Sequence, residues 1–394
     1  MFYELAVSNW GEEERAAIAA TVESDRYTMG PKVAEFEQAF ASYLGTEYGV
    51  MVNSGSSANL VATASLFFKK DKPLQAGDEA IVPALSWSTT YHPLQQYGLK
   101  LKFVDIELDT LNVDVSQLEA ALGPRTRMIV GVSILGNPAA LDVMRDFADA
   151  HGLYFFEDNC ESLDAELNGR KTGTFGEMGS HSFFFSHHIA TMEGGMVVTD
   201  DEELFHLMRS LRAHGWTRDV PDGSDIYEPR DEDFYEAYRF ILPGYNLRPV
   251  EMSGAIGLEQ LKKLPAMTAV RRKNLALFQE LFGSDDRFII QRENGSSSSF
   301  CFPIVLNPAR KPDRARVFAA LEEADIGYRI ITGGSFPKHD AIRHFDFELV
   351  GGAVDNANTA HDFGFFVGNH PFDLTPQIER VYDVLDKNCG GGNR

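Results

Sequence analysis

Cysteine is scarce in this sequence, which holds only Cys160, Cys301 and Cys389 among 394 residues and has no C-x-x-C pair. An odd number of scattered cysteines excludes a disulfide framework. The usual iron–sulfur cluster takes four cysteine ligands, and three are too few for it. We therefore expect no iron–sulfur cluster, and we expect no other metal site.

Long apolar runs are also missing. No stretch approaches the roughly 18 consecutive apolar residues that a membrane-spanning helix needs, so we expect no contact with a membrane. The first twenty residues contain Glu4, Glu12, Glu13 and Glu14 and no uninterrupted apolar segment, which predicts that there is no signal peptide. A cytoplasmic protein is the expectation.

Positive charge is in short supply, because 36 Lys and Arg residues face 58 Asp and Glu residues and leave a net charge of −22. Nucleic acids and anionic membranes are polyanions, and most of this surface would repel them. We therefore expect no nucleic acid partner. Any nucleotide ligand would have to be held in a local basic pocket.

What the sequence does contain is a regular alternation of elements. Segments with a strand pattern at 48–52, 79–83 and 153–158 are separated by segments with helical spacing, such as 141–151. Alternation of this kind predicts an α/β fold whose mostly parallel central sheet is flanked by helices. Ligands of such sheets gather at the carboxyl ends of the strands.

The length of the chain suits one large domain and one smaller domain. We expect a lead-in over residues 1–30, a large domain over 31–265 and a small C-terminal α/β domain over 266–394. One helix is expected to end near residue 264 and a separate long helix to begin near 271. The acidic segment 217–236, which has little periodicity, predicts a long loop or flap.

A serine-rich turn joins the strand at 48–52 to the next helix. Such a turn exposes backbone N–H groups at a helix N-terminus, where a phosphate is stabilised. Gly55, Ser56 and Ser57 are therefore candidates for a phosphate site. The alternative is an ordinary serine-capped helix that binds nothing.

Residues 180–195, SHSFFFSHHIATMEGG, form the stretch around which we organise the functional interpretation. A strand-like apolar run breaks into two adjacent histidines and closes on an acidic residue and two glycines. The stretch resembles the cofactor-attachment segment of the DegT/DnrJ/EryC1/StrS sugar aminotransferases, which use pyridoxal 5'-phosphate (PLP). This resemblance implies a fold-type I, aspartate aminotransferase-like transferase whose large domain binds PLP.

The resemblance implies roles for several further residues. Ser182 and the Ser56 loop would hold the phosphate, and Trp87 would stack on the ring. Asp158 matches the carboxylate that keeps the ring nitrogen protonated, so that the ring can accept electrons. Asn246 matches an asparagine that reaches the cofactor of the neighbouring subunit, which implies a homodimer. Without the resemblance, Asp158 reads as a loop cap and Trp87 as a core residue.

Glu161 departs from the family pattern, which has a glutamine near the phenolic oxygen of the cofactor. The larger departure is His187, which stands where the family has the lysine that forms a Schiff base with PLP. An imidazole cannot form that stable imine, so the cofactor would be untethered. Imidazole titrates near neutral pH and can still act as a general base and acid. We expect the adjacent His188 to point away and to be structural.

A histidine at this position marks a subgroup of the family, the sugar 3-dehydratases, and the likeness to its cluster-free branch covers nearly the whole chain. It implies that L-glutamate converts PLP to pyridoxamine 5'-phosphate (PMP), which then serves to remove the C3 hydroxyl of GDP-4-keto-6-deoxy-D-mannose. The products would be a GDP-linked 3,6-dideoxy-4-keto sugar, on the route to the colitose of lipopolysaccharide O-antigens, and ammonia.

Three alternatives stay open at this point. The chain could be a nucleotide-sugar 4-aminotransferase, a 3-dehydratase of another nucleotide sugar, or a regulator that keeps the fold without the chemistry. His214, Arg218 and Arg248 are candidate contacts to phosphate or to the glutamate carboxylate, and each could equally be an ordinary surface residue. Residue chemistry alone does not distinguish GDP from other nucleotides.

Overall fold

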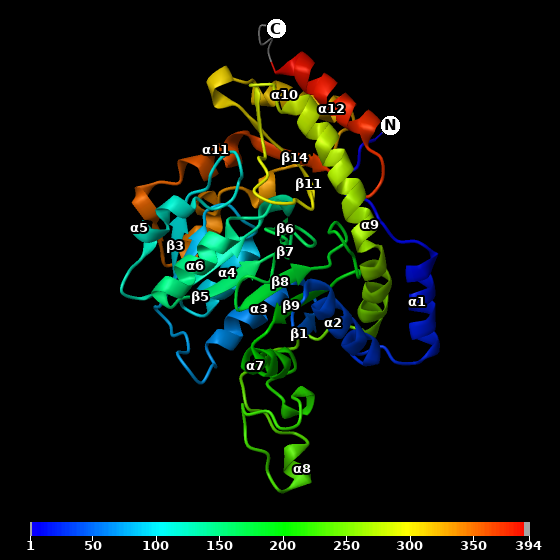
Figure 1. Ribbon diagram of the computed structural model, residues 1–394, viewed down its shortest axis with the longest axis vertical. Helices are drawn as coiled ribbons and strands as arrows, with labels where there is room; N and C mark the ends of the chain where they lie inside the picture. Colours follow the sequence, from blue (N-terminus) through cyan, green and yellow to red (C-terminus); the bar gives the residue numbers. More distant parts are fainter. Residues whose placement is uncertain (1, 390–394) are drawn as a thin grey trace.

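A computed structural model describes residues 2–389, and residues 390–394 of the expected C-terminal domain lie outside this range. The described chain forms a large part around an eight-stranded sheet and a smaller part around a four-stranded sheet. The long helix α9 (Glu251–Phe282) extends along one side of both, from α1 and α2 up to α12 (Figure 1). No helix of the described residues is long and apolar enough to cross a membrane.

The large sheet is mostly parallel, as the alternating pattern predicts. All its neighbouring strands pair in parallel except β9, which is antiparallel to both of its neighbours. The strands lie in the order β1 (Tyr48–Val52), β9 (Gly195–Thr199), β8 (Met178–Ser182), β5 (Tyr154–Asp158), β4 (Thr126–Val132), β2 (Glu79–Pro83), β3 (Lys100–Val104) and β13 (Phe347–Leu349). Parallel strands bring their carboxyl ends to one edge of the sheet, which is where a site is expected.

Side chains on successive strand residues point to opposite faces, and each face has its own apolar core. In β4, Val130 packs into the core that contains α3 (Gly55–Leu66), α4 (Ser88–Gln96) and α7 (Glu202–Arg212). Its neighbour Ile129 packs into the core that contains α5 (Leu118–Ala121) and α6 (Leu141–His151). Helices therefore cover the sheet on both faces.

The smaller part contains the antiparallel sheet β10 (Phe288–Ile290), β11 (Cys301–Leu306), β14 (Gly364–Gly368) and β12 (Tyr328–Arg329). Its helices are α10 (Arg314–Glu323), α11 (Asp355–Phe363) and α12 (Thr375–Asn388). The strands expected near 300–306 and 328–332 and the helix expected over 314–324 are all present. Tyr3 packs in this core, so the first residues of the chain join the smaller part.

The expectation of two helices on either side of residue 265 is wrong. The structure has the single 32-residue helix α9, with Pro265 inside it. A proline in a helix interior costs about 3 kcal/mol, because a hydrogen bond is lost and the ring crowds the preceding turn. Burial of Leu261, Leu264 and Met267 against α2 (Pro31–Leu44) offsets that cost. The predicted domain boundary at 265/266 falls within this helix and stays a prediction.

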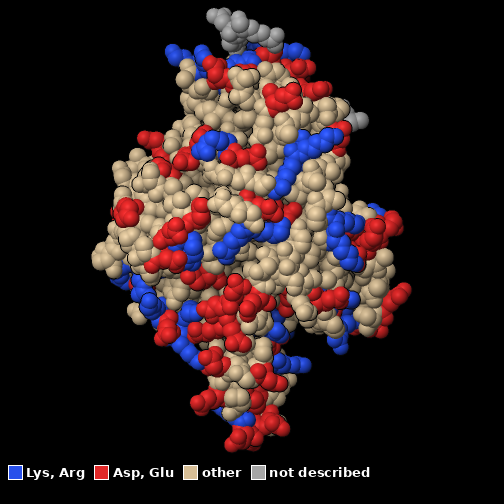
Figure 2. Space-filling model, viewed as in Figure 1, with Lys and Arg blue, Asp and Glu red and all other residues tan. Residues whose placement is uncertain are grey.

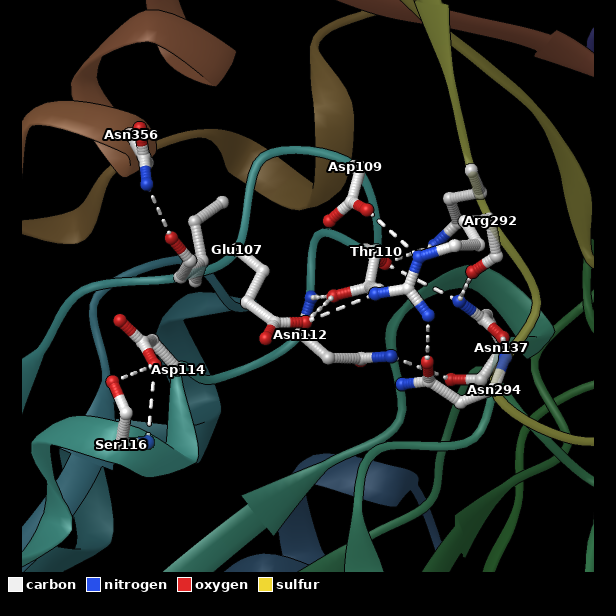
Figure 3. Close-up of polar contacts among 12 residues, drawn as sticks. Glu107, Asp109, Thr110, Asn112, Asp114, Ser116, Asn137, Arg292, Asn294 and Asn356 are labelled. Carbon is white, nitrogen blue, oxygen red and sulfur yellow. Dashed lines mark hydrogen bonds and ion pairs between the residues drawn. The ribbon is translucent and has the colours of Figure 1, made fainter. Parts of the chain in front are cut away.

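A polar network ties the chain before β11 to the loops of the large sheet (Figure 3). Arg292 donates to Asp109 over 2.7 Å, and the backbone carbonyl of Arg292 accepts from Asn137 over 2.9 Å. Asn112 donates to the carbonyl of Asn137 and accepts the N–H of Ile134 over 2.9 Å. These bonds fix the turn 134–136, which follows β4 and reaches the candidate site.

The acidic segment 217–236 protrudes from the large part and carries only the short elements η3 (Thr217–Asp219) and α8 (Asp233–Glu236), as expected for a flap (Figure 1). Figure 2 shows acidic side chains over much of this end of the molecule. Its aromatic side chains Phe234 and Tyr235 are exposed. The flap therefore presents these two rings at the surface of the described chain.

Candidate active site

A cavity of about 520 Å³ opens where the parallel strands end, between the large sheet and the smaller part. Its volume lies within the range of about 300–1,000 Å³ that is usual for ligand sites. Seven of the residues predicted from the sequence line it: Gly55, Ser56, Trp87, Asp158, Glu161, Ser182 and His187. The fold therefore gathers residues that are up to 132 positions apart in the sequence.

The start of α3 forms one end of the cavity. Ser54 caps the helix, because its hydroxyl accepts the N–H of Ser57 over 3.1 Å. The N–H groups of Gly55 and Ser56 belong to the first turn, which has no intrahelical partners for them. A Cβ on Gly55 would lie 2.6 Å from the Cβ of Ser182, so only glycine leaves this corner open. The corner is suited to an anion such as a phosphate.

Ser57 is turned away from that corner. It is not among the residues that line the cavity, and its hydroxyl donates to the side-chain oxygen of Asn53 over 2.6 Å. This bond holds the turn between β1 and α3. A direct contact of Ser57 with the cofactor stays a prediction.

Asp158 ends β5, is buried and lines the same cavity. Its Oδ2 accepts hydrogen bonds from Asn59 over 2.8 Å and from Thr90 over 2.6 Å. Its Oδ1 accepts a long bond, of 3.3 Å, from the N–H of Cys160. One carboxylate oxygen is therefore fixed by two short bonds, and the other keeps capacity to accept a further donor.

These features fit the cofactor predicted from the sequence. An anion site stands at the start of α3 and a carboxylate with a free acceptor stands at Asp158, as a phosphate and a protonated pyridine nitrogen require. Trp87 is 57% exposed although it lines the cavity, so its indole offers a broad apolar face for a ring to cover. Gly55, Ser56, Ser182, Trp87 and Asp158 would hold PLP, whose ring supplies an electron sink when it is bound.

Glu161 connects the large sheet with the smaller part. Its Oε2 accepts from the N–H of Leu135 over 3.1 Å and from the hydroxyl of Thr332 over 3.2 Å. Burial raises the pKa of Glu161 to about 7, and the charge of Asp158 adds to that effect. The carboxyl group is thus partly protonated at neutral pH. It can donate or accept a hydrogen bond inside the cavity.

His187 lies in the loop that follows β8 and is half-buried in the cavity wall. Its ring packs edge-on against Phe300, with centroids 5.2 Å apart. Burial lowers the pKa of His187 to about 4, and the positive charge of Arg271 lowers it further in the same direction. The imidazole is therefore neutral at neutral pH and has a nitrogen free to take up a proton.

The strand-like run expected through the phenylalanines is shorter in the structure. Strand β8 ends at Ser182, because its pairing with β5 stops at Ser180 and its pairing with β9 stops at Ser182. His188 is buried and its Nε2 lies 3.2 Å from the carbonyl oxygen of Ser298. As expected, His188 does not line the cavity, whereas His187 does.

Besides Ser57, four predicted residues lie outside the cavity of their own chain: His214, Arg218, Asn246 and Arg248. Arg248 donates to Asn246 over 3.1 Å, and its guanidinium lies 3.3 Å from Nε2 of His214. These three exposed side chains form one cluster, whereas Arg218 stacks separately on Trp216. The structure therefore brings three of the four together, although away from the cavity. Their roles in binding stay predictions.

Sequence reasoning missed several contributors. Asn59 and Thr90 fix Asp158, but neither belongs to a pattern that indicates such a role. Arg329, at the end of β12, lines the cavity from the smaller part, and no ion pair of this side chain is present among the described residues. Arg329 is the second residue of the strand predicted at 328–332, so the sequence pattern did not indicate its role. The described residues contain no group of three or more side chains that could hold a metal.

Comparisons with known proteins agree with this geometry. The sequence profile of the DegT/DnrJ/EryC1/StrS aminotransferase family matches residues 8–382. A GDP-4-keto-6-deoxy-D-mannose 3-dehydratase of Yersinia pseudotuberculosis is 48% identical over 387 residues, which cover 98% of each chain.

Two solved structures of GDP-4-keto-6-deoxymannose 3-dehydratase superpose on this fold. One is a variant with bound GDP-perosamine, with a TM-score of 0.95 and 46% identity, covering 97% of this chain and 100% of the other. The other holds a trapped PLP–glutamate geminal diamine, with a TM-score of 0.94, 46% identity and the same coverage.

Proposed function

Because the chain belongs to the DegT/DnrJ/EryC1/StrS aminotransferase family, we propose that it removes the C3 hydroxyl of GDP-4-keto-6-deoxy-D-mannose, using PLP and PMP, with L-glutamate as amine donor. The products are GDP-4-keto-3,6-dideoxy-D-mannose and ammonia. One observation carries this proposal. The cavity combines the anion corner at Gly55 and Ser56 with the carboxylate of Asp158, and its described lining includes His187 but no lysine.

The relatives support the substrate. A protein that is 48% identical over nearly the full length carries the name of this dehydratase. A GDP-sugar is bound in one similar structure and glutamate is attached to PLP in another. The choice of GDP comes from these relatives, because the lining of the cavity does not by itself distinguish one nucleotide from another.

The chain's own residues first bind and orient the cofactor. The N–H groups of Gly55 and Ser56 and the hydroxyl of Ser182 would hold the phosphate, and the indole of Trp87 would pack on the ring. Asp158 would hold a proton on the ring nitrogen, since its Oδ2 is already occupied by Asn59 and Thr90 and Oδ1 keeps acceptor capacity. Bound in this way, the cofactor supplies the electron sink that makes loss of the hydroxyl possible.

His187 moves the proton. Its neutral imidazole takes up a proton at a ring nitrogen and returns it, which is general base and acid catalysis worth about 10²- to 10⁴-fold. It cannot attach the cofactor covalently, as a lysine would. No lysine amine would therefore be available to displace the product from the cofactor. The product would be released by reaction with water. That outcome gives ammonia rather than an amino sugar.

We expect substitution of His187 by Asn to lower the rate of C3 deoxygenation by about 10²- to 10⁴-fold while cofactor affinity changes little. The matched control is the buried neighbour His188, whose replacement by Asn should leave the deoxygenation rate of the folded protein within severalfold of the native value. An H187N variant with a native rate would remove His187 from the mechanism.

A homodimer completes the proposed site. Asn246, Arg248 and His214 form an exposed cluster outside their own cavity, and Leu247 beside them bonds to the backbone of Asn53. This arrangement supports a role toward the neighbouring subunit's cofactor and substrate. The exposed rings of the flap would then be covered by the partner. We place the enzyme in the cytoplasm, where nucleotide sugars are made.

The test is to incubate the purified protein with PLP, L-glutamate and GDP-4-keto-6-deoxy-D-mannose and to follow ammonia, 2-oxoglutarate and the mass of the sugar. Ammonia together with loss of one oxygen from the sugar supports the proposal. 2-Oxoglutarate with an amino sugar would identify a 4-aminotransferase instead. Failure to bind PLP or PMP at all would favour a regulator.

A further inference from the structure

A second, smaller cavity lies beside the active-site cavity and shares Ser186, Phe300 and Phe366 with it. Its volume is about 60 Å³, several times the roughly 10–15 Å³ that a single water needs by the same kind of measure. The N-terminal segment 5–7 and the backbone near Asn369 complete its wall. The cavity has room for a group of carboxylate size.

The charged residue in this wall is Arg271 of α9, which is 4% exposed. Its Nη1 donates to the carbonyl oxygens of Phe300 and Asn369. Its Nε is buried without a hydrogen-bond partner, and no ion pair of Arg271 occurs within residues 2–389. The guanidinium thus has unused donors and no counter-ion.

The buried Arg212 shows the contrast. Arg212 is 1% exposed and forms ion pairs with Glu37 and Asp219. An unpaired buried charge costs several kcal/mol, which is why buried charges are normally paired. Burial accordingly lowers the pKa of Arg271 to about 10, whereas the two carboxylates beside Arg212 raise its pKa.

No acidic side chain lines the small cavity in the described part of the chain. Glu161, which lines the adjoining active-site cavity, accepts from Leu135 and Thr332 instead. A counter-ion for Arg271 would therefore have to be an anion that enters the cavity from solution. A guanidinium presents parallel N–H groups that match the two oxygens of a carboxylate.

We propose that the cavity beside Arg271 is a binding site for a small monoanion of carboxylate or halide size. Two sources supply this chemistry. One is a free anion such as chloride or formate. The other is a carboxylate of the amine donor L-glutamate, reached past Phe300 from the active-site cavity, and this second source rests on the proposed function.

The first experiment uses the native protein and needs no catalysis. Crystals are soaked in sodium bromide, and anomalous difference density is calculated. The proposal expects bromide against the Arg271 guanidinium in the small cavity. Bromide at other positions of the surface with none at Arg271 would overturn it.

The second experiment excludes binding that occurs only at crystal concentrations. Sodium [¹³C]formate is titrated by saturation-transfer NMR into native protein, R271M, R271K and R272M. Arg272 is the matched control, because it is the next residue of α9 and its guanidinium donates to the carbonyls of Ser296 and Ser297 instead. We expect R271M to weaken formate binding by about 10- to 100-fold, because the variant loses one or two charge-assisted hydrogen bonds to formate.

R271K should retain part of the affinity, and R272M should bind formate as the native protein does. If R271M does not fold, the bromide soak and the R271K titration still decide the question, since the proposal requires R271K to bind more weakly than native. Equal formate affinity in native protein and R271K or R271M would contradict the proposal.

The third experiment separates the two sources. Bromide-soaked crystals are transferred to L-glutamate with PLP present. Loss of the bromide density, with a carboxylate in its place, identifies the amine donor as the occupant. Retained bromide assigns the site to a free anion. If bromide binds but the protein neither transaminates glutamate nor deoxygenates sugar, the anion site stands and the proposed function is the part that fails.

Discussion

Replacement of Asp158 by Asn tests whether this carboxylate keeps the ring nitrogen of the cofactor protonated. In the structure, Oδ2 of Asp158 accepts two short bonds, of 2.8 and 2.6 Å, from Asn59 and Thr90, whereas Oδ1 accepts one bond of 3.3 Å from Cys160. An amide has one acceptor oxygen and one donor group. The two short bonds should therefore fix the amide oxygen at the Oδ2 position. The NH₂ group must then point where Oδ1 now faces the cavity.

The orientation of the amide determines how much the deoxygenation rate falls. The group that faces the ring nitrogen changes from an acceptor with negative charge to a neutral donor, so it can no longer hold a proton there. We expect a loss of about 10²- to 10⁴-fold in the deoxygenation rate, the range for a group positioned to hold a proton. The two hydrogen bonds to Oδ2 persist as neutral bonds, each weaker by about 1 kcal/mol than its charge-assisted form. The long bond from the N–H of Cys160 is lost as well, because an NH₂ group cannot accept it. The free energy of unfolding should therefore fall by about 2–4 kcal/mol.

The assay compares native protein, D158N and D105N. Asp105 is a matched control, because it is also buried, follows strand β3 of the same sheet and accepts backbone N–H groups, from Asn356 and Ala357, away from the cavity. D158N should bind PLP, seen by its absorbance, and fail to deoxygenate the sugar, while folded D105N should keep the native rate. A D158N variant that deoxygenates within threefold of the native rate would refute the reasoning.

Three further substitutions test other parts of the site. Gly55→Ala puts a Cβ 2.6 Å from the Cβ of Ser182, so we expect PLP affinity measured by absorbance titration to fall at least about tenfold; unchanged affinity would move the phosphate elsewhere. The raised pKa of Glu161, from 4.5 to about 7, means that its contribution to stability is present below pH 4.5 and is lost as the pH rises through about 7. Between pH 5 and 8 the free energy of unfolding should therefore decrease less in E161Q than in the native protein, by up to about 3 kcal/mol. Denaturant unfolding that shows the same decrease in both proteins would contradict this. Gly136 has φ of 95°, and a Cβ there would lie 2.5 Å from the backbone nitrogen of Ser299, so G136A should destabilise the protein by about 1–3 kcal/mol in denaturant unfolding, with native stability as the contrary result.

The sequence predicted those features that depend on local periodicity or on a single residue at a strand end. Strand β1 and helix α6 have the bounds that apolar periodicity predicts, and Gly55, Asp158 and His187 all line one cavity because parallel strands bring their carboxyl ends together. The continuous helix through Pro265 could not be predicted, because the tertiary packing that offsets the proline is not visible in local sequence.

Contacts between distant segments were also out of reach. Thr332, from the smaller part, reaches Glu161 across a separation of 171 residues, and Arg329 enters the cavity from the same side. Neither follows from periodicity or from a motif. The charge of Arg271 likewise looks ordinary in the sequence, since only the structure shows that it is buried with no ion pair to another of residues 2–389.

The most direct test of the central claim is a single turnover. Protein loaded with PMP and freed of glutamate is mixed with an equal amount of GDP-4-keto-6-deoxy-D-mannose, and both the fate of the amine and the mass of the sugar are measured. With His187 in place of a lysine, the account predicts one ammonia per active site and a sugar that has lost its C3 oxygen. A sugar that keeps this oxygen and gains the amine would contradict the account and would make the protein an aminotransferase.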